Sequence, residues 1–399
     1  MNHGKLILST LAGLVLLAPL AGCVTTHEQN VNAAEDRYQK IRAKLMLPLA
    51  RQQLESGDLE QAERTVNEAM LVDPDSAVFY VLSGRIAMER RRLERGIHRF
   101  NRAIELNDEH AEAHYYRGVI LQRWSKRDEA LKSYERAYEL EPDRPDYMMA
   151  VAEIMIDLER QDDALQLLES KLDYFAHNAG LRMALGQAYA VRGDYPKAVM
   201  FLQEAQLLDP DDIQILEELA TAQLVSGNSD EAIRHLRRLT DLPSHLNRRD
   251  LKRALATAYQ QTGRLGEARA VLERLTRQDV TDGVSWIMQA EVAWAMDDAA
   301  GAIAAARRAI VLVPGRPEGY LVSGMVWQKR GRYAEALRMY EKAERVAPDN
   351  GMPSLLRGVA LQAAGKTEAA SEAYREALRR QPTNRRAQEL LAQVTEASH

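Results

Sequence analysis

Small residues recur along the chain in a pattern with a period of 34 positions, and the pattern extends over almost its whole length. One column of small residues is followed twelve positions later by a second, and most periods then contain a proline. The first column contains Ala50, Gly84, Gly118, Ala152, Gly186, Ala220, Ala256, Ala290, Gly324 and Gly358; the second contains Ala62, Gly96, Ala130, Ala164, Ala198, Ala232, Ala268, Ala302, Ala336 and Ala370; the third contains Pro74, Pro142, Pro210, Pro314, Pro348 and Pro382. This period predicts an array of helical hairpins, because each unit is too small to bury its own apolar face and must stack on its neighbours.

The ninth period carries the fullest pattern, with Tyr320, Gly324, Trp327, Gly331, Tyr333, Ala336, Tyr340, Ala343 and Pro348. It resembles the tetratricopeptide repeat (TPR), and the resemblance extends over residues 43–384. The resemblance implies an all-α fold, a right-handed α-solenoid of ten TPR hairpins, followed by a capping helix and tail over residues 385–399. The repeats would begin at Ala43, Ala77, Ala111, Pro145, Ala179, Ile213, Arg249, Gly283, Pro317 and Gly351. Glycine after each first helix would supply the left-handed residue of a tight turn, and proline would stop the second helix.

Three departures from the repeat modify this picture. Pro48 falls inside the first helix of the first repeat, so residues 35–42 are expected to belong to a separate lead-in helix. The fourth repeat has Lys171 and Ala176 where alanine and proline are usual, which predicts looser packing. Two extra residues between the sixth and seventh repeats predict a soft joint near 241–248, within one continuous solenoid.

Residues 1–22 have the pattern of an export signal. Lys5 precedes an apolar run from Leu6 to Leu20 that is too short for a spanning helix. The four residues that end at Cys23, Leu-Ala-Gly-Cys, resemble the bacterial lipoprotein signal, in which the cysteine becomes the acylated first residue of the mature chain. Two or three acyl chains on Cys23 would give lasting attachment to a membrane. An ordinary secretory signal with a chance cysteine is the alternative, and both interpretations place the protein outside the cytoplasm.

The residue after the cysteine sorts Gram-negative lipoproteins, and aspartate there retains them at the inner membrane. Val24 occupies that position here. By this resemblance the protein is expected at the outer membrane, facing the periplasm. Residues 23–34 are polar without apolar periodicity and are expected to form a flexible tether that begins with the acylated cysteine.

Composition excludes several kinds of chemistry. Cys23 is the one cysteine among 399 residues, so the chain cannot form an intramolecular disulfide or a thiolate metal cluster. The formal net charge is -5, and removal of the signal with Lys5 makes it more negative by one charge. No basic block interrupts the mixed charges, which disfavours nucleic acid as a partner.

Residues 360–367, Ala-Leu-Gln-Ala-Ala-Gly-Lys-Thr, satisfy a permissive phosphate-binding pattern. Such a site would use Lys366 as a charge clamp and Thr367 as a magnesium ligand. The repeat, however, places Gly365 at an ordinary hairpin turn and the preceding residues inside a helix. A nucleotide-binding enzyme is therefore the weakest of the three hypotheses.

His110 and His114 lie four residues apart, a spacing that suits a metal on one face of a helix. No third ligand accompanies them, so two surface or groove histidines are the favoured interpretation. Nucleophile elbows and zinc-protease helices are missing from the sequence. We therefore expect a protein that is not an enzyme, without catalytic residues, cofactor or metal.

The concave wall of TPR arrays is formed mainly by the first helix of each repeat, at its second, fifth, ninth, twelfth and thirteenth positions. Here those positions hold adaptable apolar side chains interleaved with glutamines, which can both donate and accept hydrogen bonds. The predicted protein-binding groove consists of Val81, Tyr115, Gln122, Met149, Met183, Gln187, Gln260, Ile287, Leu321, Gln328, Leu355 and Gln362. Burial of the fifth-position side chains between neighbouring helices is the alternative. The lysine and asparagine set that clamps a chaperone's C-terminal carboxylate in the family is missing.

The leading hypothesis is a lipid-anchored scaffold that binds envelope protein segments in this groove and assists assembly of a pilus, secretion or export machine. It rests on a resemblance in architecture to TPR lipoproteins of those systems. The alternative is an adaptor for cell-wall remodelling enzymes or exopolysaccharide. Partners would be envelope proteins or peptide segments, together with the membrane through the lipid anchor. The sequence leaves monomer and homo-oligomer open.

Overall fold

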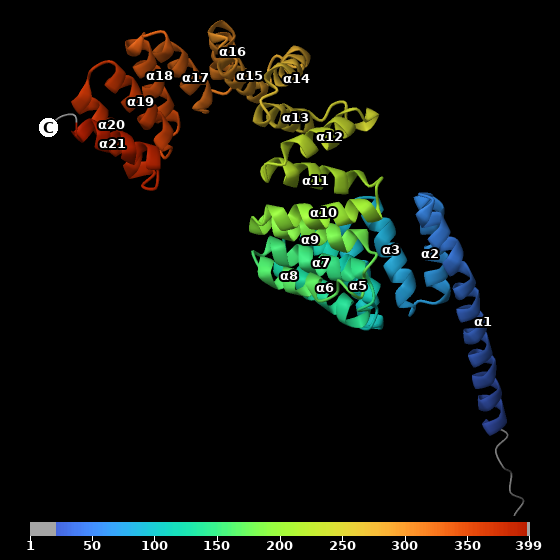
Figure 1. Ribbon diagram of the computed structural model, residues 1–399. Helices are drawn as coiled ribbons and strands as arrows, with labels where there is room; N and C mark the ends of the chain where they lie inside the picture. The colour runs from blue at the N-terminus through green and yellow to red at the C-terminus, as the bar shows by residue number, and fades with distance from the viewer. Residues whose placement is uncertain (1–20, 397–399) are drawn as a thin grey trace, which may run out of the picture. The chain divides into compact units, whose positions relative to one another are not determined.

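Every regular element in the described part of the chain is helical (Figure 1). The computed structural model describes residues 21–396, with side chains from residue 29 onward. This range contains 21 α-helices and one short 3-10 helix, and no strand occurs within it. The helices belong to two compact units, residues 1–170 and residues 171–399. The predicted class, an all-α solenoid, is confirmed.

The first unit contains α1 (Ala21–Glu55), α2 (Leu59–Val72), α3 (Ala77–Glu89), α4 (Leu93–Leu106), α5 (Ala111–Arg123), α6 (Arg127–Leu140), α7 (Pro145–Asp157) and α8 (Gln161–Glu169). The second contains α9 (Ala179–Arg192), α10 (Tyr195–Leu208), α11 (Ile213–Val225), α12 (Ser229–Thr240), η1 (Pro243–His245), α13 (Arg249–Gln261), α14 (Leu265–Gln278), α15 (Gly283–Ala295), α16 (Ala299–Leu312), α17 (Glu318–Lys329), α18 (Tyr333–Val346), α19 (Gly351–Ala363), α20 (Thr367–Arg380) and α21 (Arg385–Glu396). Within each unit consecutive helices pack against one another in chain order (Figure 1). Helices begin at the expected repeat starts from Ala77 to Gly351, except that α17 begins one residue after Pro317.

Each hairpin is closed by a small residue in its first helix and a large one in its second. The pairs are sixteen residues apart: Gly84 with Phe100, Gly118 with Tyr134, Gly186 with Leu202, Gly324 with Tyr340 and Gly358 with Tyr374. A Cβ atom at any of these glycines would overlap the partner side chain. All five large partners are buried, so the missing side chain allows each of them to lie directly against the opposite helix.

Each turn between the helices of a hairpin contains one residue with a positive φ. Glycine occupies this position in six repeats, as Gly57, Gly193, Gly227, Gly263, Gly331 and Gly365, which confirms the predicted left-handed turn residue. Arg91, Ser125, Glu159 and Asp297 occupy it in the other four, with φ between 57° and 62°. A residue with a Cβ atom pays about 1–2 kcal/mol in this conformation. Packing of the two flanking helices therefore imposes the turn even where glycine is missing.

The N-terminal helix differs from its prediction. α1 is unbroken and includes Pro48, so the lead-in helix over 35–42 is not separate from the first repeat. The predicted tether over 23–34 is helical as well. Both expectations were wrong: Pro48 does not interrupt α1, and residues 23–34 continue the helix that packs on α2, since lengthening an existing helix is easier than starting one. The predicted signal lies outside the described residues up to residue 20, and the side chain of Cys23 is also outside them.

The boundary between the two units lies between Ser170 and Lys171, whereas the sequence predicted one continuous solenoid with a soft joint at 241–248. α8 has 9 residues, whereas α6 and α10, the second helices of other repeats, each have 14. Lys171 stands in a column where Ala137 and Ala205 are completely buried. A lysine cannot take that place without losing the hydration of its charge, so the helix ends early.

The inserted segment at 241–248 is firmly bonded to α11. His245 is buried, and its Nε2 donates a hydrogen bond to Oε1 of Glu217 at 2.8 Å. Its Nδ1 therefore accepts from Oγ of Ser244, at 2.7 Å. Arg248 donates to both carboxylate oxygens of Glu217, at 3.1 and 2.8 Å. One carboxylate thus joins the insertion to the preceding repeat.

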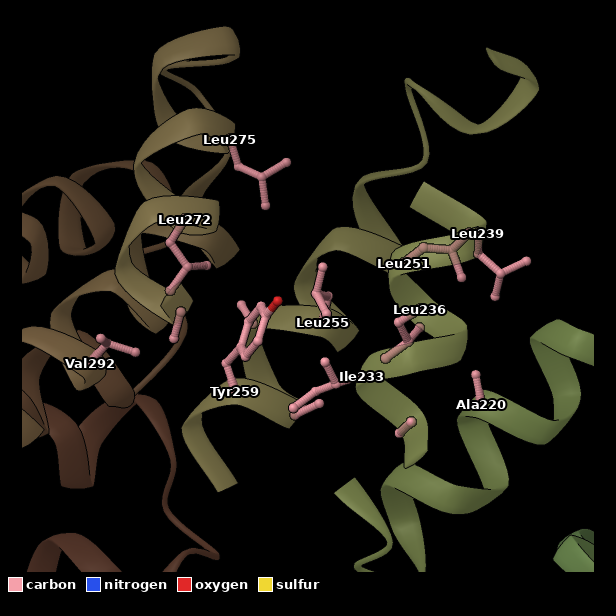
Figure 2. Packing of buried hydrophobic residues seen from close by; sticks show 14 of the residues in the cluster. Ala220, Ile233, Leu236, Leu239, Leu251, Leu255, Tyr259, Leu272, Leu275 and Val292 are labelled. Carbon is pink, nitrogen blue, oxygen red and sulfur yellow. The ribbon is translucent and has the colours of Figure 1, made fainter. Parts of the chain in front are cut away.

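Apolar packing also continues across the insertion (Figure 2). The labelled side chains come from α11 to α15 and form one buried cluster: Ala220, Ile233, Leu236, Leu239, Leu251, Leu255, Tyr259, Leu272, Leu275 and Val292. Leu239 and Leu275 stand where other repeats have a small residue, and both are buried in this cluster. Continuous burial on both sides of the two extra residues explains why no unit boundary falls there.

Glu217→Gln is expected to lower the free energy of unfolding by about 1–3 kcal/mol at pH 7, because it weakens charge-assisted hydrogen bonds from Arg248. Those bonds, followed by the bond from His245, hold the pKa of Glu217 below its ordinary value of 4.5 against the opposing effect of burial. A lowered carboxyl pKa contributes stability above pH 4.5 that is lost as the pH falls through the folded-state value. Urea unfolding of both proteins from pH 7 to pH 3 should therefore show a shrinking difference. A constant difference would contradict this account, and Glu267→Gln, at an exposed position of α14, is the control.

α21 closes the C-terminal end of the second unit. Ala387, Leu390 and Val394 are buried against α20, whereas Arg385 and Arg386 are exposed. The amphipathic helix expected after the last repeat is thus present, with its apolar face on the final hairpin.

Candidate functional site

A surface cavity of about 340 Å³ lies in the second unit, across the first helices of three successive repeats. Its lining comes from α15, α17, α18 and α19 and consists of Trp294, Met325, Gln328, Lys329, Tyr333, Leu356 and Ala363. The volume lies near the lower end of the range found for ligand pockets. Aromatic, thioether and aliphatic groups surround one amide and one ammonium group, a composition that suits an apolar side chain of a partner segment.

Lys329 is held in place by two interactions. Its ammonium group forms an ion pair with Asp297 and lies 5.5 Å from the centre of the Trp294 ring. Asp297 is the residue with positive φ in the turn after α15. The lysine charge is therefore compensated within the protein, and the lining offers mainly the indole ring and the neighbouring apolar groups.

Gln328 is oriented by Tyr340 of α18. The Tyr340 hydroxyl donates to Oε1 of Gln328 at 2.8 Å, so the carbonyl end of the amide is engaged. The amide nitrogen has no hydrogen-bond partner among the described residues and can donate to a carbonyl of a bound segment. The same bond recurs from Tyr374 to Gln362, at 2.6 Å, and from Tyr134 to Gln122, at 2.7 Å. These three glutamines thus join the two helices of their hairpins.

The carboxylate of Glu291, on the face of α15 that carries Trp294, has no oppositely charged group in direct contact among the described residues. Glu291 lies three residues before Trp294 in α15, a spacing that places both on one face. Burial raises the pKa of Glu291, the charge of Glu318 raises it further, and Arg316 opposes the increase. Within the described range no hydrogen bond or ion pair reaches this carboxylate. A cationic group on a partner would stabilise its charged form.

The twelve predicted groove residues do not form one site. Gln328 is the member of that set that lines the cavity. Val81, Ile287 and Leu355 are buried in the hydrophobic core, so they cannot contact a partner and their assignment to an open wall was wrong. The set also includes Tyr115, Gln122, Met149, Met183, Gln187, Gln260 and Leu321, which are half-buried, and Gln362, which is exposed.

Tyr115 belongs to an aromatic cluster in the first unit. The centre of its ring lies 5.2 Å from that of Tyr116, 5.7 Å from that of Tyr134 and 4.9 Å from that of Tyr147. Burial raises the pKa of the Tyr115 hydroxyl. Tyr115 therefore supports the packing of α5 on α6 and α7, and its substitution would disturb stability together with any recognition.

Two residues that define the cavity were missed, although the sequence contained a signal for them. Trp294 and Met325 occupy the twelfth and ninth positions of their helices, which the TPR resemblance assigns to the concave wall. The predicted groove was built from fifth-position residues and glutamines, so it did not include Trp294 and Met325. Leu356 occupies a sixth position, for which the sequence carried no such signal.

Residues 360–367 form the end of one helix and the start of the next. α19 ends at Ala363, Gly365 has a φ of 73°, and α20 begins at Thr367. The backbone amides of Ala364, Gly365 and Lys366 donate to carbonyls of α19. The donors that a phosphate cradle would need are therefore engaged in closing the helix.

His114 is buried, which corrects the expectation of a surface or groove histidine. Its Nε2 donates to the carbonyl oxygen of Asp108 at 2.9 Å, and burial lowers its pKa. His110 occupies the N-cap position of α5. The described part of the chain contains no group of three or more histidine, cysteine, aspartate or glutamate side chains placed to hold a metal ion.

Family models described as tetratricopeptide repeat match residues 43–68, 87–245, 217–282, 253–317, 287–353 and 328–394. The chain belongs to the tetratricopeptide repeat family. Proteins of this family act as scaffolds for interactions between proteins, and they bind protein partners or peptides. A helix long and apolar enough to span a bilayer does not occur in the described range.

Several solved structures are similar to this chain, at low identity. Pseudomonas aeruginosa PilF is 15% identical, with 52% of this chain and 94% of that one covered and a TM-score of 0.46. Yeast Tom70 is 14% identical, with 90% and 88% covered and a TM-score of 0.48. A pentatricopeptide repeat-containing protein of Arabidopsis thaliana is 27% identical over 171 residues, which are 41% of this chain and 39% of that protein. The chain thus spans well under half the length of that relative.

Proposed function

We propose that this protein is a lipid-anchored TPR scaffold that binds envelope protein segments and assists assembly of a pilus, secretion or export machine. The observation that carries the binding part is the cavity formed by three successive first helices in the second unit. The lipoprotein-like sequence that ends at Cys23 supports attachment to the outer membrane, with the repeats in the periplasm. The binding cavity and the membrane anchor together support a scaffold that recruits other proteins and does not modify them.

The cavity favours an extended segment with one apolar side chain. That side chain would lie among Trp294, Met325 and Leu356, where its removal from water provides the main favourable free energy. The amide nitrogen of Gln328 would donate a hydrogen bond to a backbone carbonyl of the segment and fix the register of the segment. Glu291, one helix turn away, favours a lysine or arginine beside the apolar residue.

The experiment is a quantitative pull-down from membranes with the acylated protein. Trp294→Ala combined with Met325→Ala should reduce recovery of specific partners at least about tenfold, because removal of central anchors in an interface typically costs 2 kcal/mol or more. The matched control is Val311→Ala, an apolar side chain on α16 that is exposed and outside the cavity.

Equal recovery by the double variant and the control would contradict the assignment of this cavity as the recognition site. Circular dichroism and thermal unfolding of both variants separate loss of binding from loss of fold. After a high-salt wash, which weakens contacts between charged side chains and lipid, a Cys23→Ser protein should leave the membrane fraction, and its retention there in full would contradict the anchoring part.

A further inference from the structure

α1 carries an exposed apolar stripe that no other element of the described chain covers. Val31, Tyr38, Ile41, Leu45 and Leu49 have exposed fractions of 48%, 64%, 59%, 74% and 49%. Their spacing of seven, three, four and four residues places them along one face of the helix. Five large apolar side chains in a row exceed the scattered exposure that is normal on a protein surface.

The opposite face of α1 is the one that packs on the protein. Ala43, Ala50 and Leu54 are buried there in a cluster with Val66 and Ala69 of α2. α2 therefore leaves the stripe uncovered. Residues 29–38 are exposed on every side, and a helix of that length without contacts is marginal in water. The N-terminal half of α1 consequently needs an external partner to remain ordered.

The charges beside the stripe are mostly positive. Residues 29–51 contain five cations and two acids, although the whole chain has a formal charge of -5. The cations are Arg37, Lys40, Arg42, Lys44 and Arg51, and the acids are Glu35 and Asp36. Arg42 forms an ion pair with Glu68 at 2.7 Å, and the remaining cations still outnumber the acids. A helix with a continuous apolar face, an aromatic residue on it and flanking lysine and arginine is complementary to an anionic lipid surface.

We propose that α1 lies on the surface of an anionic bilayer, with Tyr38, Ile41 and Leu45 at the boundary between headgroups and acyl chains. Arg37 and Lys44 flank this face and would contact lipid phosphates. A second copy of the chain fits less well: if Tyr38 and Leu45 formed the seam of a parallel coiled coil, Arg37 of one chain would face Arg42 of the other. The inference extends the proposed anchoring, but it concerns α1 itself and does not require acylation.

The test uses the mature chain with Cys23→Ser, so that no acyl chain contributes, and vesicles of phosphatidylcholine with or without phosphatidylglycerol. Sedimentation should show binding to the anionic vesicles at least about tenfold stronger than to neutral ones, and weaker at high salt. Ile41→Glu combined with Leu45→Glu should reduce that binding at least about tenfold. Leu71→Glu, on a strongly exposed position of α2 in the same unit, is the control and should bind as the parent does.

Equal binding by the double variant and the control would overturn the proposal, and so would failure of the parent to bind either vesicle. Analytical ultracentrifugation of the same proteins identifies the competing occupant. A dimer of the parent that Ile41→Glu with Leu45→Glu dissociates, without vesicle binding, would assign the stripe to a second copy. None of these results depends on partner recovery in the pull-down, so the lipid contact and the proposed scaffold function can fail separately.

Discussion

Tyr340→Ala is expected to lower the free energy of unfolding of the second unit by about 3–5 kcal/mol, the range for removal of a large buried aromatic side chain. The ring of Tyr340 is fully buried against Gly324, where no side chain could shift to fill the space. The substitution also removes the hydroxyl that engages Gln328. Urea unfolding followed by circular dichroism measures the loss.

Tyr340→Phe separates the two contributions. It keeps the ring and removes the hydrogen bond to Gln328, so it should cost only about 0.5–1.5 kcal/mol. A loss under 1.5 kcal/mol for Tyr340→Ala, or equal losses for both variants, would show that the contact between ring and glycine does not close the hairpin.

Gly358→Ala is expected to destabilise the same unit by about 1–3 kcal/mol, although alanine ordinarily stabilises a helix relative to glycine. A Cβ atom at Gly358 would overlap the buried ring of Tyr374, which is held in place by its bond to Gln362 at 2.6 Å. The ring or the helix must therefore move. The midpoint and slope of the urea transition measure the change.

Gly266→Ala provides the control of opposite sign. Gly266 lies inside α14, and an added Cβ atom would meet nothing within 4 Å. Alanine there should raise the free energy of unfolding by about 0.4–1 kcal/mol, because it reduces the conformational freedom of the unfolded chain. If both substitutions shifted the transition in the same direction, helix propensity and not contact with Tyr374 would govern the glycine column.

The repeat architecture could be predicted from sequence because its contacts are local. A glycine and the ring sixteen residues later belong to one hairpin, so the pair recurs with the period, as in Gly324 with Tyr340. The turn residue is equally local. Its geometry appears even at Ser125 and Asp297, where the glycine signal is missing, because the flanking helices impose it.

The candidate site could be predicted only in part, because its lining depends on contacts between repeats. Ile287 and Leu355 share a helix position with Leu321, yet they are buried and Leu321 is half-buried. Since their position in the repeat is the same, contacts with neighbouring helices decide which of them remains accessible. The cavity is lined by both Trp294 and Leu356, which are 62 positions apart in the sequence. A pattern within one repeat cannot predict that these two side chains lie close together.

The two irregular segments also depend on contacts that the sequence pattern does not contain. Two extra residues near 241–248 indicate looseness in a sequence, but a buried His245 and the carboxylate of Glu217 fill the space they create. At Lys171, where looser packing was predicted, α8 ends early and the boundary of the two units falls. Whether an irregularity loosens the array depends on the partners it meets in space.

The most direct test of the central claim is site-specific photo-crosslinking in membranes. A photoreactive amino acid at Met325, in the cavity, should join the protein to partner segments, whereas the same group at Val311 on α16 should not. Mass spectrometry of the product at position 325 should identify a segment with an apolar residue beside lysine or arginine. Equal crosslinking from both positions, or partners joined only through Val311, would contradict recognition by this cavity.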